Sequence, residues 1–506
     1  MMPNYRRKMS IGILRSTFVL ASITSTQIPL CAVTFNEHVA PIIFENCTSC
    51  HRAGEAAPFS FTNYKEVRKR AQLIAEVTSE RFMPPWHAES TDIKFAGERR
   101  LSNAQIKILS DWVEAGAPEG NHAKLPKLPD FPSGWQLGKP DLIVEMAEAF
   151  EVPASGPDIY RNFVIPLNLK ENKWVKAIEF RPGAPSVVHH SLFFYDTTGE
   201  ALKLDRLSPE PGFQRMGRFV RSGSLGGWAV GGTPRPLPSD LAYILPKGAD
   251  LVLSTHFHPV GKTAKEKSVV GFYFADKPPS QGFTDIQLPP LFGATAGIDI
   301  PAGEKRYVKK DAFVLPVDTK AFGISAHAHY LGKEMKMDAV LPSGKRKQLL
   351  WIKDYDFNWQ EPYNFAEFLY LPKGTRIESQ IVWDNSADNP NNPSRPPKRV
   401  GWGRESEDEM GSITLQVVAE QPQQLSLLKR EYSQHSRNVV ARRVRDASEQ
   451  LRNARADSFE DIPKAILARY KARYDKDGNG KLSEEERSAA LAAWKKFINS
   501  RRRARN

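Results

Sequence analysis

Cysteine is scarce in this sequence of 506 residues, which contains only Cys31, Cys47 and Cys50. A disulfide framework of the kind that small secreted domains use is therefore excluded. Beyond the N-terminus, no stretch reaches the roughly 18 apolar residues of a membrane-spanning helix, so we expect no membrane span. The formal net charge is +13, but the one dense basic run (residues 501–505) ends the chain without a recognition motif, so we expect no nucleic-acid partner.

The N-terminal residues have the pattern of an export signal. Residues 6–8 (RRK) are basic, residues 11–24 are mostly apolar although Arg15 interrupts them, and residues 30–32 (LCA) offer a small-residue cleavage site. We therefore expect residues 1–32 to be a signal peptide and the chain to be periplasmic or secreted in a bacterium. The alternative is an ordinary N-terminal helix.

A motif for covalent haem attachment follows this signal. Residues 47–51 (CTSCH) have the C-x-x-C-H pattern, in which two thiols form thioethers to the porphyrin and the histidine binds the iron. A zinc site would need two more ligands at matching spacing, and a redox dithiol would not need His51. The sequence thus predicts haem c, bound by Cys47, Cys50 and His51, and a separate electron donor to it.

The second axial ligand of the iron is predicted to be Met83, in the segment RFMPPWHAE. A thioether there would raise the potential relative to a bis-histidine site. His87, in the same segment, is the alternative ligand, and a core position is the alternative role for Met83.

Two helix-start signals accompany the haem motif. Asn63-x-x-Glu66 and Ser102-x-x-Gln105 have the capping-box pattern, and apolar residues at helical spacing follow each. We expect a small all-α cytochrome c domain over residues 33–123, followed by a proline-rich linker over residues 124–139.

The pattern then changes to short β-type runs separated by glycine, proline and asparagine, which is typical of antiparallel sandwiches or jelly rolls. Such runs occupy residues 174–180, 187–195, 251–256, 269–274, 324–329 and 377–383. About 280 residues exceed one small sandwich. The sequence therefore predicts two all-β jelly-roll domains, residues 140–287 and 288–420, with the break in the proline- and glycine-containing stretch 288–297.

The histidines of this region fall into three tight groups: His189-His190, His256-x-His258 and His327-x-His329. On a strand, residues i and i+2 share a face, so each H-x-H places two imidazoles side by side. Adjacent histidines point to opposite faces unless the strand ends or bulges there. Three such groups on β-type runs favour a metal site over chance surface histidines.

Ligand chemistry narrows the choice of metal. Three imidazoles suit zinc or copper, whereas two imidazoles with a methionine thioether favour copper, because the soft sulfur prefers Cu(I). Met410, at the head of a late β-type run, is the candidate thioether.

At this point a resemblance to a known family becomes specific. The segments VVHHSLFFY, LVLSTHFHPVGK, ISAHAHYLGKEM and EDEMGSITLQV, in that order, resemble the copper type II, ascorbate-dependent monooxygenases. That family includes peptidylglycine alpha-hydroxylating monooxygenase and dopamine beta-monooxygenase. The resemblance covers roughly residues 140–420, and it implies two jelly-roll domains facing each other across a solvent-filled cleft, each holding one copper.

Carried over residue by residue, the resemblance implies two ligand sets. The electron-transferring copper would be bound by His189, His190 and His256. The catalytic copper, at which dioxygen reacts, would be bound by His327, His329 and Met410. His258 would lie behind the ligands of the first set. In the family, one atom of dioxygen hydroxylates a substrate C–H bond, and the other copper supplies the second electron.

This sequence departs from the family at the substrate site. Peptide-hydroxylating members have an arginine that binds the substrate carboxylate where this sequence has Ser325, and a tyrosine usually found after the methionine ligand is Thr414 here. No cysteines are left for the disulfides of the animal enzymes. These differences leave the copper chemistry intact but give no basis for a peptide or catecholamine substrate. The aromatic stretch 355–359 (YDFNW) either lines a substrate cleft or packs in the core or on the surface.

The C-terminal residues 456–506 are predicted to form an α-helical EF-hand module. Residues 475–486 (DKDGNGKLSEEE) match a calcium loop at every diagnostic position, with Gly480 at the sharp turn. The expected calcium ligands are Asp475, Asp477, Asn479, Lys481 through its carbonyl, Ser483 and Glu486. The alternative is a charged helix–loop–helix without metal. Residues 421–455 are expected to be a helical tether.

Together these features predict a multidomain copper-dependent monooxygenase that hydroxylates a small-molecule or peptide substrate with dioxygen. Electrons would arrive through the fused haem. Two alternatives stay open: a non-catalytic copper and haem protein for electron transfer or metal binding, and a hydrolase with zinc at the three-histidine site.

Overall fold

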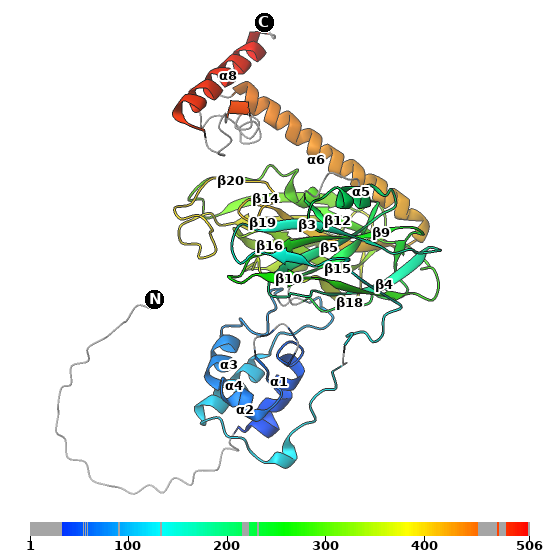
Figure 1. Ribbon diagram of the computed structural model, residues 1–506, viewed down its shortest axis with the longest axis vertical. Coiled ribbons are helices and arrows are strands. Elements are labelled where there is room, and N and C mark those ends of the chain that lie inside the picture. Colours follow the sequence, from blue (N-terminus) through cyan, green and yellow to red (C-terminus); the bar gives the residue numbers. More distant parts are fainter. Residues whose placement is uncertain are drawn as a thin grey trace, which may run out of the picture.

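The computed structural model describes residues 33–53, 55, 57, 59–89, 92–131, 134–214, 222–229, 232–453, 473–474 and 482–503. These residues form a small helical unit, two β-sandwiches and C-terminal helices (Figure 1). The β portion consists of sandwich, jelly-roll-like sheets, as the sequence predicted. Each of the six predicted β-type runs lies on a strand.

The helical unit packs around Phe35, Ile43 and Trp112, none of which is exposed. Ser102 begins a helix with the predicted capping box: its Oγ accepts a hydrogen bond from Gln105 N at 3.2 Å, and Gln105 Oε1 accepts one from Ser102 N at 2.8 Å. The helix expected after Asn63 is instead two short ones, interrupted at residues 69–70. The elements are η1 (Phe35–Val39), α1 (Ala40–Asn46), α2 (Tyr64–Arg68), α3 (Ala71–Ser79), α4 (Asn103–Glu114) and η2 (His122–Lys124).

A segment of the expected cytochrome domain leaves this helical unit and joins the second sandwich. We call residues 86–89 and 92–100 the strap. Trp86, Ala88 and Phe95 are buried in the core of the second sandwich. Backbone bonds fix the strap there, because Glu89 N donates to Trp351 O at 2.7 Å and Ala96 N donates to Asn364 O at 2.8 Å. Sequence alone suggested one continuous helical domain over residues 33–123.

The first sandwich joins a four-stranded sheet, order β1-β11-β4-β8, to a five-stranded sheet, order β6-β3-β9-β5-β7. Its core contains residues of both sheets, such as Leu253 and Phe272. Helix α5 (Glu200–Arg206) and the ribbon of β2 (Phe150–Val152) with β10 (Ala264–Glu266) complete it. The sheet strands are β1 (Leu142–Glu145), β3 (Ile159–Pro166), β4 (Lys173–Arg181), β5 (Val188–Asp196), β6 (Phe213–Gln214), β7 (Gly223–Ala229), β8 (Tyr243–Leu245), β9 (Asp250–Phe257) and β11 (Val269–Phe274).

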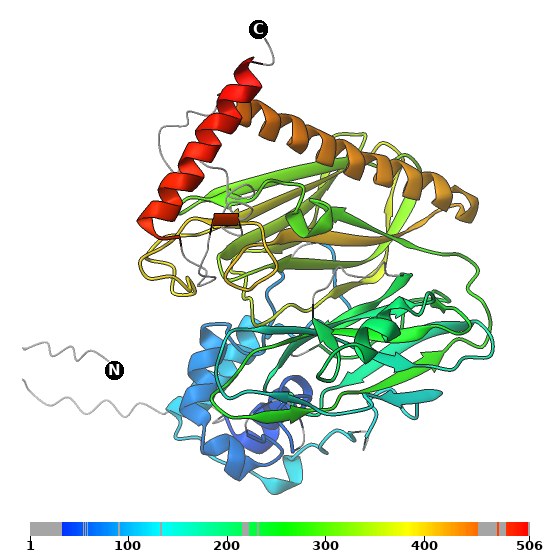
Figure 2. The same cartoon turned by 45° about the horizontal axis from the view of Figure 1, so that its top comes forward.

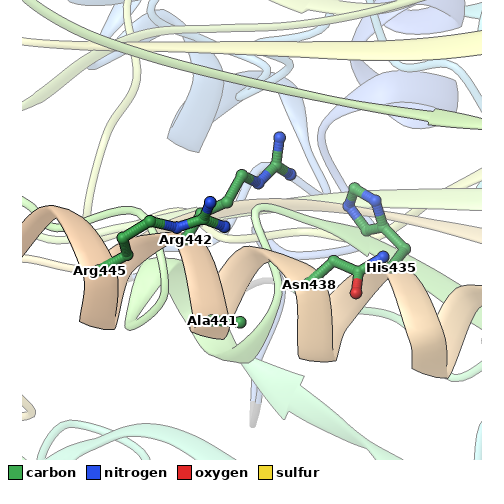
Figure 3. A pocket seen from close by; sticks show the side chains of 5 residues that line it. All are labelled: His435, Asn438, Ala441, Arg442 and Arg445. Atoms are coloured by element: carbon green, nitrogen blue, oxygen red, sulfur yellow. The ribbon is translucent and has the colours of Figure 1, made fainter.

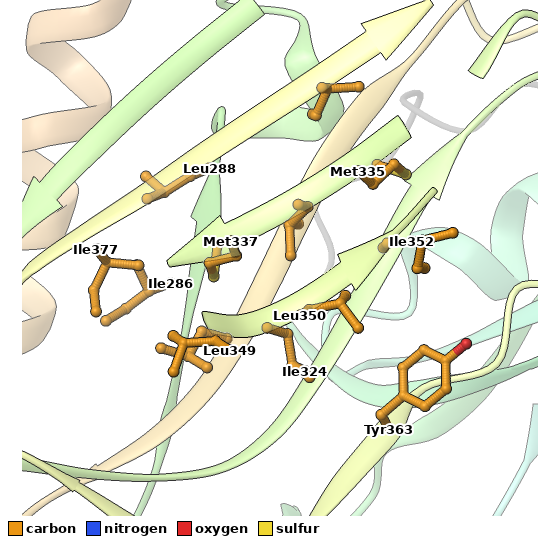
Figure 4. Packing of buried hydrophobic residues seen from close by; sticks show 14 of the residues in the cluster. Ile286, Leu288, Ile324, Met335, Met337, Leu349, Leu350, Ile352, Tyr363 and Ile377 are labelled. Carbon is orange, nitrogen blue, oxygen red and sulfur yellow. The ribbon is translucent and has the colours of Figure 1, made fainter. Parts of the chain in front are cut away.

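The second sandwich joins sheets of order β12-β21-β15-β18 and β14-β19-β16-β17. Aliphatic residues and methionines from both sheets interdigitate in its core (Figure 4). Its elements are β12 (Thr284–Leu288), η3 (Leu291–Gly293), β13 (Asp299–Ile300), β14 (Tyr307–Val314), β15 (Thr319–Ala328), β16 (Gly332–Val340), β17 (Arg346–Ile352), β18 (Tyr363–Leu371), β19 (Arg376–Trp383), β20 (Val400–Gly401) and β21 (Gly411–Ala419). Strand β12 already belongs to the second sandwich, because it pairs with β21. The stretch 288–297, where we expected the break between the domains, is therefore mostly the loop that follows β12.

The long helix α6 (Leu425–Asn453) follows the short turn η4 (Pro422–Gln424) and occupies the region of the expected tether. Its first turns pack on the second sandwich: Leu428 is fully buried, and Tyr432 Oη donates to Gln287 O at 2.8 Å. Figure 2 shows α6 crossing this sandwich and α8 (Glu484–Arg503) extending beyond it. Among the described residues, no helix is long and apolar enough to span a membrane.

Candidate metal centre

Three histidines of the first sandwich converge on one point. His189 and His190 come from β5, and His256 comes from the neighbouring strand β9. Their candidate ligand atoms all lie within 4.8 Å of one another. His189 Nδ1 and His190 Nδ1 are 3.1 Å apart. Two nitrogens about 2.0 Å from one ion, at angles of about 90–110°, would be separated by about 2.8–3.3 Å, so this spacing fits a shared metal.

A bulge in β5 allows two adjacent histidines to face the same side. The register with β9 shifts between Val188, opposite Phe257, and His190, opposite His256. His189 is therefore the extra residue, and the usual alternation of side chains is interrupted there. The sequence had left open whether such a bulge exists.

The protonation state of this group suits metal binding. Burial, together with neighbouring histidines, lowers the pKa of His189 to about 3, and it also lowers the pKa values of His190 and His256. The imidazoles are therefore neutral near pH 7, which is the form that binds metals. His256 Nδ1 is buried without a hydrogen-bond partner. Such an atom is costly unless something binds it.

Asp158 lies behind this group. Its Oδ2 is 3.0 Å from His256 Nε2, although not in hydrogen-bond geometry, and its Oδ1 is 2.8 Å from His258 Nδ1. Burial alone would raise the pKa of the Asp158 carboxyl, but the contacts with His256 and Ser406 hold it well below its usual range. A carboxylate on the far nitrogen of a histidine orients the ring and leaves Nδ1 for a metal. Half-exposed His258 thus contacts the supporting carboxylate, as expected for a residue behind the ligands.

A second pair of imidazoles belongs to the second sandwich. His327 lies on β15, and His329 directly follows that strand. Gln360 Oε1 accepts a hydrogen bond from His327 Nδ1 at 2.6 Å, and Asp408 O accepts one from His329 Nδ1 at 3.1 Å. Both Nε2 atoms are left to bind a metal. Burial lowers the pKa of His327 to about 4 and that of His329 to about 3, so both rings are neutral.

Met410 is placed beside this pair by the strand register. Antiparallel β15 and β21 pair His327 with Ser412 and Ala328 with Gly411. One further step puts Met410 opposite His329. Its backbone is held there, because Trp383 Nε1 donates to Met410 O at 3.2 Å.

Glu409, which precedes Met410, is a buried carboxyl group that fixes the end of this strand. It accepts hydrogen bonds from His329 N at 3.1 Å, Leu331 N at 2.6 Å and Trp383 Nε1 at 2.9 Å. Burial raises the pKa of Glu409 to about 8. No sequence pattern predicts this role, apart from the position of Glu409 next to Met410.

Phe357 stands between the two histidine groups. Its ring stacks on His189 with centroids 4.5 Å apart, and its centroid is 5.7 Å from that of His329. The side chain is 5% exposed. Of the two roles left open for residues 355–359, Phe357 therefore fills space between the groups, while the Tyr355 Oη bonds to the backbone of Ala328 as a core residue.

The predicted haem motif lies at the end of α1. His51 N donates to Cys47 O at 2.9 Å, so the motif forms one turn. His51 Nδ1 lies 3.2 Å from Phe59 O, which fixes this nitrogen as a donor and leaves Nε2 for iron. Burial and the Cys50 charge raise the pKa of the Cys47 thiol to about 12. That is the reverse of a redox dithiol, whose attacking cysteine has a lowered pKa.

The two candidates for the sixth iron ligand have different surroundings. Met83 follows α3, and its N–H donates to Val77 O at 3.0 Å, within the helical unit. His87 lies on the strap, where burial lowers its pKa and Asp356 and Asp354 of the second sandwich are its neighbours.

Of the predicted calcium loop, residues 475–486, the structure describes only residues 482–486. Asp475, Asp477, Asn479 and Lys481 lie outside the described residues. Ser483 and Glu486 form a capping box that begins α8: Ser483 N donates to Glu486 Oε2 at 2.9 Å, and Glu486 N donates to Ser483 Oγ at 3.3 Å.

A separate surface pocket lies along α6, lined by His435, Asn438, Ala441, Arg442 and Arg445 (Figure 3). His435 Nε2 is 3.2 Å from Asp311 Oδ2 of β14. None of these residues belongs to an expected ligand set, so this pocket is distinct from the histidine groups.

Comparisons with known proteins add little. No protein family and no curated protein matches the sequence. The solved structures that match include the major capsid protein P2 of bacteriophage PM2 (10% identity, 55% of this chain and 96% of that chain, TM-score 0.23). Sulfolobus Turreted Icosahedral Virus (12%, 60% and 96%, 0.23) and PNGF-II (10%, 55% and 65%, 0.22) also match. At these TM-scores the likenesses carry no functional argument.

Proposed function

We propose that this chain is a copper-dependent monooxygenase that hydroxylates a substrate C–H bond with dioxygen and receives electrons through a c-type haem. The observation that carries the proposal is the pairing of two neutral imidazole groups on either side of Phe357. One group has three histidines, and the other has two histidines next to a methionine. Unequal ligand sets of this kind favour two copper sites with different tasks over two equivalent structural sites.

Copper bound at these groups would supply the redox chemistry with dioxygen, and haem would supply electrons. The side chains around the histidines orient the imidazole rings. Gln360 accepts a hydrogen bond from the far nitrogen of His327, and the Asp158 carboxylate lies 3.0 Å from the far nitrogen of His256, so the two rings present their free nitrogens in fixed directions. Phe357 keeps water out of the space between the groups, which limits side reactions there.

The remaining predictions belong to the same proposal. Met83 is the favoured sixth haem ligand, because His87 is engaged with the second sandwich. The EF-hand is proposed to bind calcium, and the N-terminal signal is proposed to direct the chain to the periplasm or outside the cell.

Metal analysis with oxygen uptake tests this proposal. The chain expressed with its signal should contain about two coppers and one iron, and it should consume oxygen when reduced. His327→Ala should abolish oxygen uptake and remove about one copper, whereas His122→Ala, a change on the exposed turn η2, should do neither. A chain that binds only zinc and never consumes oxygen would favour a hydrolase, and Met410→Ile should then leave its activity unchanged. Copper binding without oxygen uptake would favour an electron-transfer or metal-binding protein.

A further inference from the structure

We propose that the substrate is an uncharged organic molecule with an apolar portion, and that Leu291, Phe292 and Trp402 form the surface on which it binds beside His327. We call these three residues the apolar rim. The inference rests on the proposed function and names the substrate class of that site.

The apolar rim is exposed and borders an expected ligand. The Phe292 ring meets the His327 ring edge-on, with centroids 5.4 Å apart, yet Phe292 is still 36% exposed. Leu291 beside it is 61% exposed. Trp402 is half-buried against the same loop, because its Nε1 donates to Phe292 O at 3.1 Å. Large apolar side chains open to solvent next to a metal-type site are typical of a ligand surface.

The loop that carries Leu291 and Phe292 has an unfavourable backbone conformation at both residues. Leu291 and Phe292 both have a left-handed conformation, with φ of 55° and 53°. Residues other than glycine rarely adopt the left-handed conformation, and two such residues in succession are rarer still. Such conformations persist where the surroundings enforce them, and they gather at functional sites.

The surroundings here do enforce the conformation. Phe292 N donates to Gln287 Oε1 at 2.9 Å, so both backbone polar groups of Phe292 have fixed partners. Gly293 packs so closely that a Cβ atom on it would lie 2.6 Å from Gly411 O. Since Gly411 begins β21 directly after Met410, the loop of Leu291 and Phe292 is fixed next to an expected ligand.

Three uncharged polar side chains, those of Ser325, Thr414 and Gln287, lie near the rim. Ser325 pairs with Thr414 in the strand register, and both share the sheet face of His327 by alternation. Gln287 Nε2 donates to Thr414 Oγ1 at 3.2 Å. Hydroxyls and an amide can bind an alcohol, ether or carbonyl group. They do not offset a full charge, so a carboxylate would lose hydration there without compensation.

Binding of two matched probes tests the inference: ethylbenzene, and 4-ethylbenzoate, which adds only a carboxylate. Ligand-observed NMR on the copper-loaded, oxidised full chain gives both Kd values without turnover. We expect ethylbenzene to bind at least about tenfold more tightly. Phe292→Gly should weaken it about fivefold to tenfold, the effect of losing one aromatic contact. Leu291→Ser should weaken it as well, whereas Leu207→Ser, at a residue 72% exposed after α5, should not.

Phe292→Gly also separates binding from folding. Glycine adopts a φ of about +53° freely, so the melting temperature should stay the same or rise while ethylbenzene binding falls. Equal Kd values for the two probes, or unchanged binding in Phe292→Gly, would overturn the inference. Copper content and oxygen uptake of the same samples distinguish the failures. A chain that binds copper and consumes oxygen but does not discriminate the probes overturns the substrate class alone, whereas one without copper overturns the proposed function.

Discussion

Truncation of Phe357 should reveal what the ring between the two histidine groups contributes. The side chain is 5% exposed and contacts His189 and His329 from opposite sandwiches. A buried phenylalanine changed to alanine costs about 3–5 kcal/mol of unfolding free energy. The space opened would be on the order of 100 Å³, room for about three waters at about 30 Å³ each. We therefore expect Phe357→Ala both to destabilise the fold and to admit water between the groups.

A matched control isolates the second effect. Phe313 is also 5% exposed in the core of the second sandwich, but its ring packs on Tyr432 and His435 of α6. Phe313→Ala and Phe357→Ala should lower the unfolding free energy in urea by similar amounts. Only Phe357→Ala should alter the copper EPR spectrum and divert consumed oxygen to hydrogen peroxide, and Phe357→Leu should restore most of the loss. Equal spectra and equal peroxide yields in both alanine variants would show that Phe357 is a packing residue only.

Three further predictions concern the groups around the histidines. Gln360→Ala removes the acceptor for His327 Nδ1 and should weaken copper binding at that site about 10- to 100-fold in a copper titration, while Gln360→Glu should retain it. The metal-free chain should lose stability as the pH falls below 6.5 toward 4, because the folded state holds His327 neutral at a pKa of about 4 while the unfolded chain binds the proton; an unchanged urea midpoint between pH 7.5 and 5 would contradict this. Glu409→Ala leaves the buried backbone donors His329 N and Leu331 N without their acceptor and should cost about 3–5 kcal/mol in urea unfolding, more than Glu409→Gln.

The strands and capped helices were predictable because their signals are local. Period-two alternation on β15 places Ile324, Ala326 and Ala328 in the core and leaves His327 on the opposite face. Ser102 and Gln105 satisfy each other across three residues, so their capping box needs no tertiary context. The same locality explains why two histidines of an H-x-H could be placed side by side without a structure.

Residues that support the site were not predictable, because their contacts span long stretches of sequence. Asp158 precedes His256 by 98 residues in the sequence, and Gln360 contacts His327 from a loop. No spacing rule relates such positions. Phe292 was missed for a different reason, since one exposed aromatic residue in a proline- and glycine-containing stretch has no pattern of its own. Only its backbone conformation and its contact with His327 distinguish it.

The strap changes how the predicted haem relates to the histidine groups. The Glu361 side chain, 2% exposed, contacts Arg99 of the strap and Arg235 of the first sandwich, and Arg235 Nη1 also donates to Ala96 O at 2.9 Å. Removal of either arginine would leave a buried carboxylate with one cation fewer, which lowers the stability of the fold. The contacts of Glu361 therefore hold together the strap, the first sandwich and the loop that carries Glu361. Glu361 directly follows Gln360, the acceptor for His327. A proline-rich linker alone would leave the helical unit at a variable distance, whereas the strap fixes it to the loop that orients an expected ligand. Under the proposed function, this contact would fix the distance over which electrons pass from the haem to the copper sites.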